Sequence, residues 1–253
     1  MRLYLIDLGH CDVDKGMVLT PGSDVGKRVV IPIVGYLIQS DDGKNILVDS
    51  GMHRKHIKDP EATFRDTEFG NYLSVLMKPE DDIANRLAEL DLKPEDIDIL
   101  VSTHFHFDHA GNHVDFSRSR IVSQREHYEY AKANPAPFPL DIWDLPQLKY
   151  ELIDGDVELV PGVRLLKTNG HAPGHMSVIV DLKNTGRVIL AIDAVYTLEN
   201  LERSNWSGYQ DPDAALASAN RLAEMAEREN ALLITGHDPG QWAGLKMAPE
   251  FYD

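Results

Sequence analysis

Six consecutive residues, HFHFDH at positions 104–109, hold three histidines and one aspartate. They directly follow the apolar run 97–101, which is typical of a buried strand. Imidazole and carboxylate groups are ligands that suit zinc, iron, cobalt and manganese. A single zinc ion needs three such groups and a water molecule, so four of them in so short a segment predict a pair of metal ions. The apolar strand that leads into the motif disfavours a set of surface histidines.

An extended backbone through the motif would place His104, His106 and Asp108 on one side, because the side chains of a strand alternate between its two faces. A turn at Asp108 and His109 would then swing His109 toward a second metal position. We therefore expect the motif to serve two neighbouring ions.

Three more ligand-type residues each follow an apolar segment of their own. They are His171 after 163–167, Asp193 after 188–192 and His237 after 231–236. A side chain at the end of a buried strand is supported by a rigid sheet, as site residues commonly are. The sequence thus predicts one site that is assembled from several strand ends.

The order H-x-H-x-D-H, G-H, D and G-H resembles the metallo-β-lactamase superfamily of binuclear hydrolases. The resemblance covers nearly the whole chain. It implies an α/β fold, a four-layered αβ/βα sandwich in which two mixed β-sheets are flanked by helices. No segment has the composition of a linker, so we expect residues 1–253 to form a single metallo-β-lactamase-like hydrolase domain.

The same resemblance implies a set of metal ligands. The set is His104, His106 and His171 for the first ion, Asp108, His109 and His237 for the second, and Asp193 as the bridge between them. The implied cofactor is two divalent ions per chain, with zinc in first place and iron, cobalt or manganese as alternatives. Asp49, after the apolar run 46–48, matches an aspartate that orients the ligands from outside the coordination shell.

A finer resemblance is to the N-acyl homoserine lactonases and related γ-lactone hydrolases. It rests on Phe107 inside the metal motif, on D-A-x-Y-T at 193–197, on G-H-D at 236–238 and on the segment 248–252. It implies a quorum-quenching carboxylic ester hydrolase that acts on a small neutral lactone. The sequence around Gly111 and the loop 53–80 leave the preferred lactone open.

The resemblance also implies roles for residues that hold no metal. Hydroxide supplied by the metal pair would attack the lactone carbonyl, and the Tyr196 hydroxyl would stabilise the developing oxyanion. Asp108 is the candidate proton carrier to the leaving alkoxide. Phe64, Phe69 and Phe107 are the candidate lining of the substrate pocket.

Composition limits the classes of partner. A formal charge of −16 disfavours nucleic acid, and no apolar segment approaches the length of a membrane span. Cys11 is the only cysteine, and the N-terminal segment lacks the features of a signal peptide, so we expect a cytoplasmic protein. Relatives that dimerise through their loops make a homodimer a further expectation.

Other functions share parts of this pattern. A binuclear phosphotriesterase, or another ester or thioester hydrolase, could use the same metal pair. A glyoxalase-type thioesterase is disfavoured, because few residues follow His237. The absence of Gly-x-Ser-x-Gly disfavours a serine hydrolase. A metal-binding protein without catalysis would not need Tyr196.

Hydrophobic patterns predict the elements that position the site. The predicted strands are 3–8, 29–38, 45–49, 97–103, 120–123, 163–168, 177–182, 187–193 and 231–235, and the predicted helices are 80–90, 123–133 and 212–228. Asp211 and Pro212 are typical of the start of the last helix. The remaining histidines are predicted to face solvent or to support the ligands. These are His10, His53, His56, His113, His127 and, as a support for its own loop, His175.

Overall fold

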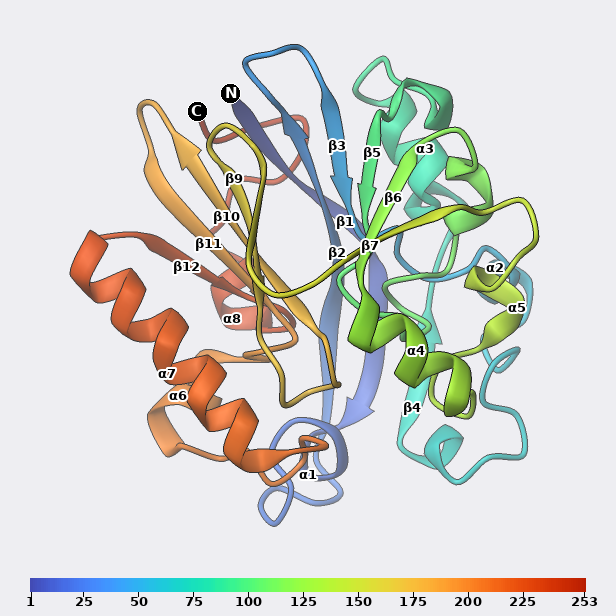
Figure 1. Cartoon of the computed structure of the whole chain (residues 1–253). Coiled ribbons are helices and arrows are strands. Elements are labelled where there is room, and N and C mark those ends of the chain that lie inside the picture. The colour runs from blue at the N-terminus through green and yellow to red at the C-terminus, as the bar shows by residue number, and fades with distance from the viewer.

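The structure is a computed structural model that describes residues 1–253. Two β-sheets pack face to face, and helices cover the outer face of each (Figure 1). Both sheets mix parallel and antiparallel pairs, such as β3 with β5 and β1 with β2. The predicted four-layered α/β sandwich is therefore confirmed.

The seven-stranded sheet follows the order β4 (Leu73–Leu76), β1 (Arg2–Asp14), β2 (Arg28–Gln39), β3 (Asn45–Val48), β5 (Ile99–Val101), β6 (Arg120–Gln124) and β7 (Tyr150–Ile153). The five-stranded sheet follows the order β12 (Leu232–Thr235), β11 (Gly186–Ile192), β10 (Met176–Leu182), β9 (Val163–Lys167) and β8 (Val157–Val160). The helices are α1 (Lys15–Val18), α2 (Lys55–Lys58), α3 (Ile83–Ala88), α4 (Arg125–Ala133), α5 (Leu140–Trp143), α6 (Leu198–Arg203), α7 (Pro212–Glu229) and α8 (Pro239–Trp242). Single 3₁₀ turns lie at Phe69–Asn71, Pro79–Asp81, Pro94–Asp96 and His113–Phe116.

Alternating side chains explain why the central strands are buried on both faces. In β11, Val188 and Leu190 belong to the core between the sheets, whereas Ile189 packs in the core under the helices. Strand β1 does the same with Leu5 and Ile6. Each fully buried side chain of this size stabilises the fold by roughly 1.5–3 kcal/mol, so a sheet with helices on one side and a second sheet on the other is strongly favoured.

The longest helix, α7, covers the five-stranded sheet, and α3 and α4 lie over the other sheet (Figure 1). The Asp211 side chain accepts a hydrogen bond from the Ala214 backbone N–H, which confirms the predicted helix start. None of the helices has the length and apolar character needed to span a membrane.

Several predicted boundaries are wrong. β1 continues to Asp14, because a bulge at Gly9, whose φ is +97°, lets the strand bend without ending. α3 begins only at Ile83, since Asp82 adopts an extended conformation and caps it. α4 begins at Arg125, because Ser123 and Gln124 remain paired with β7.

The extended backbone predicted through the metal motif is also wrong. β5 ends at Val101, and residues 102–110 form a loop and a turn. His104 and His106 therefore do not share a strand face with Asp108. The turn instead directs the two histidines and the aspartate toward different groups of ligands.

Candidate metal centre

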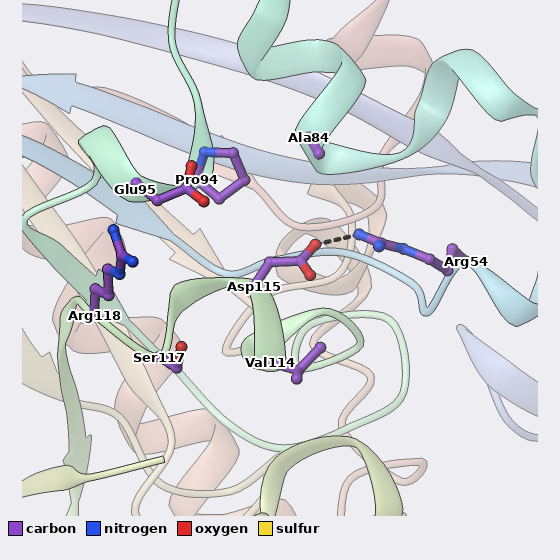
Figure 2. A pocket seen from close by; sticks show the side chains of 8 residues that line it. All are labelled: Arg54, Ala84, Pro94, Glu95, Val114, Asp115, Ser117 and Arg118. Atoms are coloured by element: carbon purple, nitrogen blue, oxygen red, sulfur yellow. Dashed lines mark hydrogen bonds and ion pairs between the residues drawn. The ribbon is translucent and has the colours of Figure 1, made fainter. Parts of the chain in front are cut away.

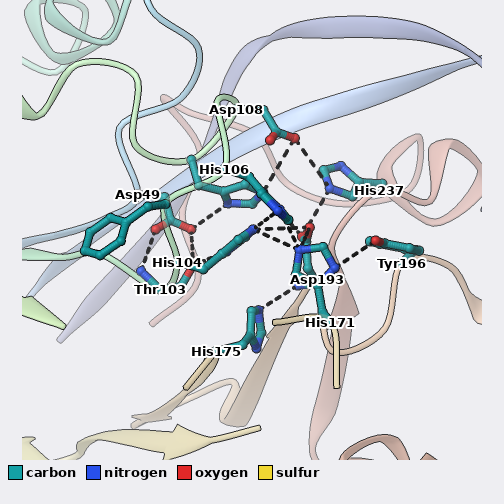
Figure 3. Close-up of polar contacts among 12 residues, drawn as sticks. Asp49, Thr103, His104, His106, Asp108, His171, His175, Asp193, Tyr196 and His237 are labelled. Atoms are coloured by element: carbon teal, nitrogen blue, oxygen red, sulfur yellow. Dashed lines mark hydrogen bonds and ion pairs between the residues drawn. The ribbon is translucent and has the colours of Figure 1, made fainter. Parts of the chain in front are cut away.

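Three imidazoles meet at the first group of ligands. Nε2 of His104, Nδ1 of His106 and Nε2 of His171 lie 2.8–3.1 Å from one another (Figure 3). Three nitrogens bound to one tetrahedral zinc would lie about 3.3 Å apart, so this triangle is close to a zinc-binding geometry. The loop after β5 supplies two of these side chains, and the loop between β9 and β10 supplies the third.

A second group lies beside the first and is made by Asp108, His109 and His237. The Asp108 Oδ2 atom is 3.6 Å from His109 Nε2 and 3.9 Å from His237 Nε2. His237 follows the end of β12, while Asp108 and His109 come from the turn after β5. Each group thus combines side chains from both sheets.

Asp193, which directly follows β11, faces both groups with different oxygens. Its Oδ2 atom lies 3.2 Å from His171 Nε2 and 3.6 Å from His104 Nε2. Its Oδ1 atom lies 3.1 Å from His237 Nε2 and 3.3 Å from His109 Nε2. One carboxylate is therefore placed to contribute an oxygen to each of two ions.

The outer nitrogens of His109 and His237 are held by neighbouring groups. His109 Nδ1 lies 2.8 Å from Asp49 Oδ2, and His237 Nδ1 lies 2.9 Å from the Pro32 carbonyl oxygen. Asp49 also accepts hydrogen bonds from the backbone and hydroxyl of Thr103 at 2.9 and 2.7 Å. Such contacts fix the tautomer and leave the inner nitrogen free to bind a metal.

Burial and nearby charges shift the pKa values of the histidines in opposite directions in the two groups. Burial lowers the pKa of His106 to about 4 and lowers those of His104 and His171 well below their usual value. Burial acts in the same direction on His109, but nearby carboxylates, Asp193 foremost, raise its pKa well above the usual value. Asp193 likewise outweighs the effect of burial on His237 and raises its pKa.

Two buried atoms at the junction of the groups are left without hydrogen bonds. They are His109 Nε2 and Asp193 Oδ1, which lie 3.3 Å apart without hydrogen-bond geometry. An unpartnered buried polar atom is costly, and so is the convergence of three neutral imidazole nitrogens in the first group. A pair of divalent cations would satisfy these atoms and the imidazole triangle, so the donors present fit two metal ions.

Tyr196 lies beside the first group. Its hydroxyl is 2.8 Å from His171 Nδ1, the nitrogen that faces away from the triangle. The ring packs against Tyr209 at a tilt of 31°, with centroids 4.7 Å apart, and the Tyr209 hydroxyl accepts a hydrogen bond from the Tyr196 backbone N–H. Burial raises the pKa of the Tyr196 hydroxyl well above its usual value, which keeps the phenol protonated.

The three phenylalanines predicted for the pocket form one cluster. Phe64 packs edge-to-face against Phe107 and Phe69, with ring centroids 4.6 and 5.1 Å apart. Phe107 is buried, whereas Phe69 remains 41% exposed at the surface. The structure thus joins the metal motif to an apolar patch that reaches solvent.

The other histidines lie outside both groups of ligands. His175 accepts a hydrogen bond from the Asp193 backbone N–H at 3.2 Å. Of the two predicted roles, burial rules out facing solvent for His56, His113 and His127. Their supporting contacts follow no spacing that a sequence pattern reveals, and Tyr209, which packs behind Tyr196, was likewise not predicted.

A cavity of about 410 Å³ lies elsewhere on the surface (Figure 2). Arg54, Asp115 and Arg118 are among its lining residues, and Arg54 pairs with Asp115 there. Asp82 forms a second ion pair with Arg54, at 2.9 Å. None of the predicted ligands, Tyr196 or the pocket phenylalanines lines this cavity.

Comparisons with known proteins agree with this geometry. A family model described as the metallo-beta-lactamase superfamily matches residues 29–237. The N-acyl homoserine lactonase AiiA of Bacillus thuringiensis subsp. kurstaki is 38% identical over 99% of this chain and 98% of its own. The lactonase AttM of Rhizobium radiobacter is 30% identical over 100% of this chain and 98% of its own.

A solved N-acyl homoserine lactone hydrolase has the same fold. That structure, which holds the product N-hexanoyl-L-homoserine at its catalytic metal centre, aligns with a TM-score of 0.92. It is 36% identical to this chain and covers 99% of it and 98% of its own length. The chain therefore belongs to the metallo-β-lactamase superfamily, in its group of N-acyl homoserine lactonases.

Proposed function

We propose that this chain is a two-metal lactonase that opens the ring of N-acyl homoserine lactones and so inactivates quorum-sensing signals. The observation that carries the proposal is the Asp193 carboxylate, whose two oxygens face two separate groups of histidine ligands. The relatives that align with this chain over nearly its whole length are named N-acyl homoserine lactonases.

The seven predicted ligands are proposed to hold the two ions, with Asp193 between them. When bound, two such ions supply a hydroxide nucleophile at neutral pH and polarise the substrate carbonyl. We propose zinc, because neutral imidazoles and carboxylates in a compact arrangement are its usual ligands. The lowered pKa values of His104, His106 and His171 favour the neutral form of these rings, which metal binding requires.

Tyr196 is proposed to donate a hydrogen bond to the lactone carbonyl. A metal on Nε2 of His171 requires the proton to sit on Nδ1, which then donates to the Tyr196 oxygen at 2.8 Å. The phenol accepts that bond, so its own proton is free to point toward substrate. The raised pKa of Tyr196 keeps this proton in place, and the hydrogen bond strengthens as negative charge develops on the carbonyl oxygen.

Asp108 is proposed to carry a proton to the leaving alkoxide. Its side chain keeps 12% of its surface exposed, whereas the Asp193 side chain keeps 4%, so Asp108 is the more accessible of the two carboxylates. The cluster of Phe64, Phe69 and Phe107 is proposed to bind the acyl chain, because it is apolar and open to solvent at Phe69.

The proposal also covers the domain organisation and the location of the protein. Residues 1–253 are proposed to act as one domain, since the core between the sheets combines strands from both halves of the chain. A cytoplasmic location is proposed because the one cysteine, Cys11, is buried and unpaired.

The direct test is hydrolysis of a lactone panel by purified protein, with metal analysis of the same sample. The panel varies ring size and acyl chain length and includes a phosphotriester and a thioester as competing substrates. We expect ring opening of N-acyl homoserine lactones to be fastest and to stop after chelation. Faster turnover of the phosphotriester or thioester, or no lactone hydrolysis by protein with two ions, would contradict the proposal.

A further inference from the structure

His127 joins the two loops that carry the first group of ligands. It lies in α4 and is fully buried. Its Nε2 atom accepts a hydrogen bond from the Phe105 backbone N–H at 2.8 Å. Its Nδ1 atom lies 2.8 Å from the Pro173 carbonyl oxygen. Phe105 stands between the ligands His104 and His106, and Pro173 lies two residues after His171.

The partners fix the tautomer of this ring. A backbone N–H can only donate and a carbonyl oxygen can only accept, so Nε2 carries a lone pair and Nδ1 carries the proton. Both nitrogens are fully used by backbone groups, which leaves His127 unable to bind a metal itself. Both of its bonds also reach the main chain, so the position of the ring limits where the two loops can lie.

Packing leaves the ring little freedom to move. It contacts the rings of Phe105 and Phe138, with centroids 4.9 and 5.1 Å away. A Cβ atom at Gly174 would lie only 2.5 Å from the His127 backbone nitrogen, so the loop after His171 rests directly on α4. A backbone hydrogen bond from Met176 N–H to the Thr103 carbonyl also joins the two segments, and it is longer at 3.2 Å.

We propose that His127 is a positioning residue for the first metal ion: it sets the distance between the histidine pair His104 and His106 and the third ligand, His171. It makes no comparable contact with the ligands of the second ion. This inference rests on the proposed metal centre and does not depend on which lactone is the substrate.

The test compares three variants by titration of metal-free protein with zinc against a chromophoric chelator. His127→Phe keeps a ring but removes both hydrogen bonds. His127→Gln retains one acceptor and one donor. His113→Phe is the matched control, because His113 is also a fully buried histidine of low pKa, but its hydrogen bond goes to the Tyr150 hydroxyl. Its ring lies 6.1 Å from that of Phe105, a packing contact that phenylalanine retains, and it makes no hydrogen bond to either ligand loop.

We expect His127→Phe to weaken the affinity for one of the two zinc ions by roughly 10–100-fold and to leave the affinity for the other unchanged. In a His109→Ala background, the second group lacks one of its ligands. There the affinity for the ion at the first group should weaken by the same factor. His127→Gln should bind both ions almost as the wild type does. His113→Phe should lower the melting temperature without changing either affinity.

Unchanged zinc binding by His127→Phe, equal weakening of both equivalents, or the same binding defect in His113→Phe would overturn the inference. Lactone hydrolysis by the wild type is measured separately. A wild type that binds two ions without hydrolysing lactones would contradict the proposed function and leave this inference standing. A wild type that binds fewer than two ions would contradict both.

Discussion

Asp193 is the residue on which the two groups of ligands depend together. It is almost completely buried, and burial alone would raise the pKa of a carboxyl group. The imidazoles of His109, His237 and His171 outweigh this effect and hold the pKa of Asp193 well below its usual range. The carboxylate is therefore ionised before any metal binds, with each oxygen already directed at one group of ligands.

Replacing Tyr196 with phenylalanine tests the proposed carbonyl donor. The substitution removes the hydroxyl but keeps the ring that packs against Tyr209. Loss of one oxyanion donor typically lowers kcat by about 10²–10³-fold, and we expect the lower part of that range because metal would still polarise the same oxygen. The measurement is kcat and KM on one lactone at matched metal content. An unchanged kcat/KM would show that Tyr196 lines the site without donating a hydrogen bond to the carbonyl.

The affinities for the two ions should respond differently to pH. In the metal-free protein nearby carboxylates raise the pKa values of His109 and His237, so a metal must compete with protons there at a higher pH than at the first group. The first group has lowered pKa values, about 4 for His106, and is already neutral. Between about pH 8 and about pH 6, zinc titrations should show one affinity that falls steeply and one that changes little. Parallel changes of both affinities would contradict this assignment.

Strand ends place the residues of the site that lie outside the metal motif. β3 ends directly before Asp49 and β11 directly before Asp193, while β12 ends shortly before His237. This arrangement was predictable, because runs of apolar residues identify buried strands and polar side chains mark where they end. The route of the chain after β5 was not, since the turn at residues 106–110 follows from tertiary contacts such as the backbone bond from Ser50 to His109.

The strands that hydrophobic patterns missed share one property. β4, β7 and β8 are short and lie at the edges of their sheets. An edge strand pairs on one side only and keeps part of its surface in water, so charged residues such as Glu151 and Glu158 interrupt its apolar pattern. Hydrogen bonds to neighbouring strands hold these segments in an extended conformation. Sequence patterns do not reveal that pairing.

Gly170 shows how a helix supports a ligand loop. The residue before His171 has a φ of +128°, and a Cβ atom there would lie 2.3 Å from the Ala215 backbone in α7. Gly170→Ala should therefore displace the loop and weaken zinc binding at the first group, measured by titration of the purified variant.

Gly43→Ala is the matched control for this prediction. Gly43 also has a positive φ, +82°, but a Cβ atom there meets nothing within 4 Å. We expect it to cost only backbone strain, on the order of 1–3 kcal/mol of unfolding free energy, with normal zinc binding. Equal metal defects in both variants would show that strain alone, and not contact with α7, is responsible.

At the scale of the whole molecule, the metal centre connects the two sheets. Each group combines two side chains from the loop after β5 in one sheet with a histidine from the other sheet, His171 or His237. Ions bound at both groups would therefore hold the two layers of the sandwich together at this end.

Removing the ions should lower the stability of the whole fold. A ligand present at about a thousandfold excess over its Kd stabilises the folded state by about 4 kcal/mol. For a chain of this size, each kcal/mol shifts the melting temperature by roughly 2–4 °C. We expect chelation to lower the melting temperature by on the order of 10 °C, with recovery after zinc is added back. An unchanged melting temperature would mean that the ions do not link the sheets.

We propose that one Asp193 carboxylate joins two ions into a single catalytic unit. The most direct test is to add zinc stepwise to metal-free protein and to follow hydrolysis of N-hexanoyl-homoserine lactone. We predict that activity rises until two ions are bound per chain, and that Asp193→Asn loses tight binding of both ions together with activity. Full activity at one ion per chain would contradict the claim.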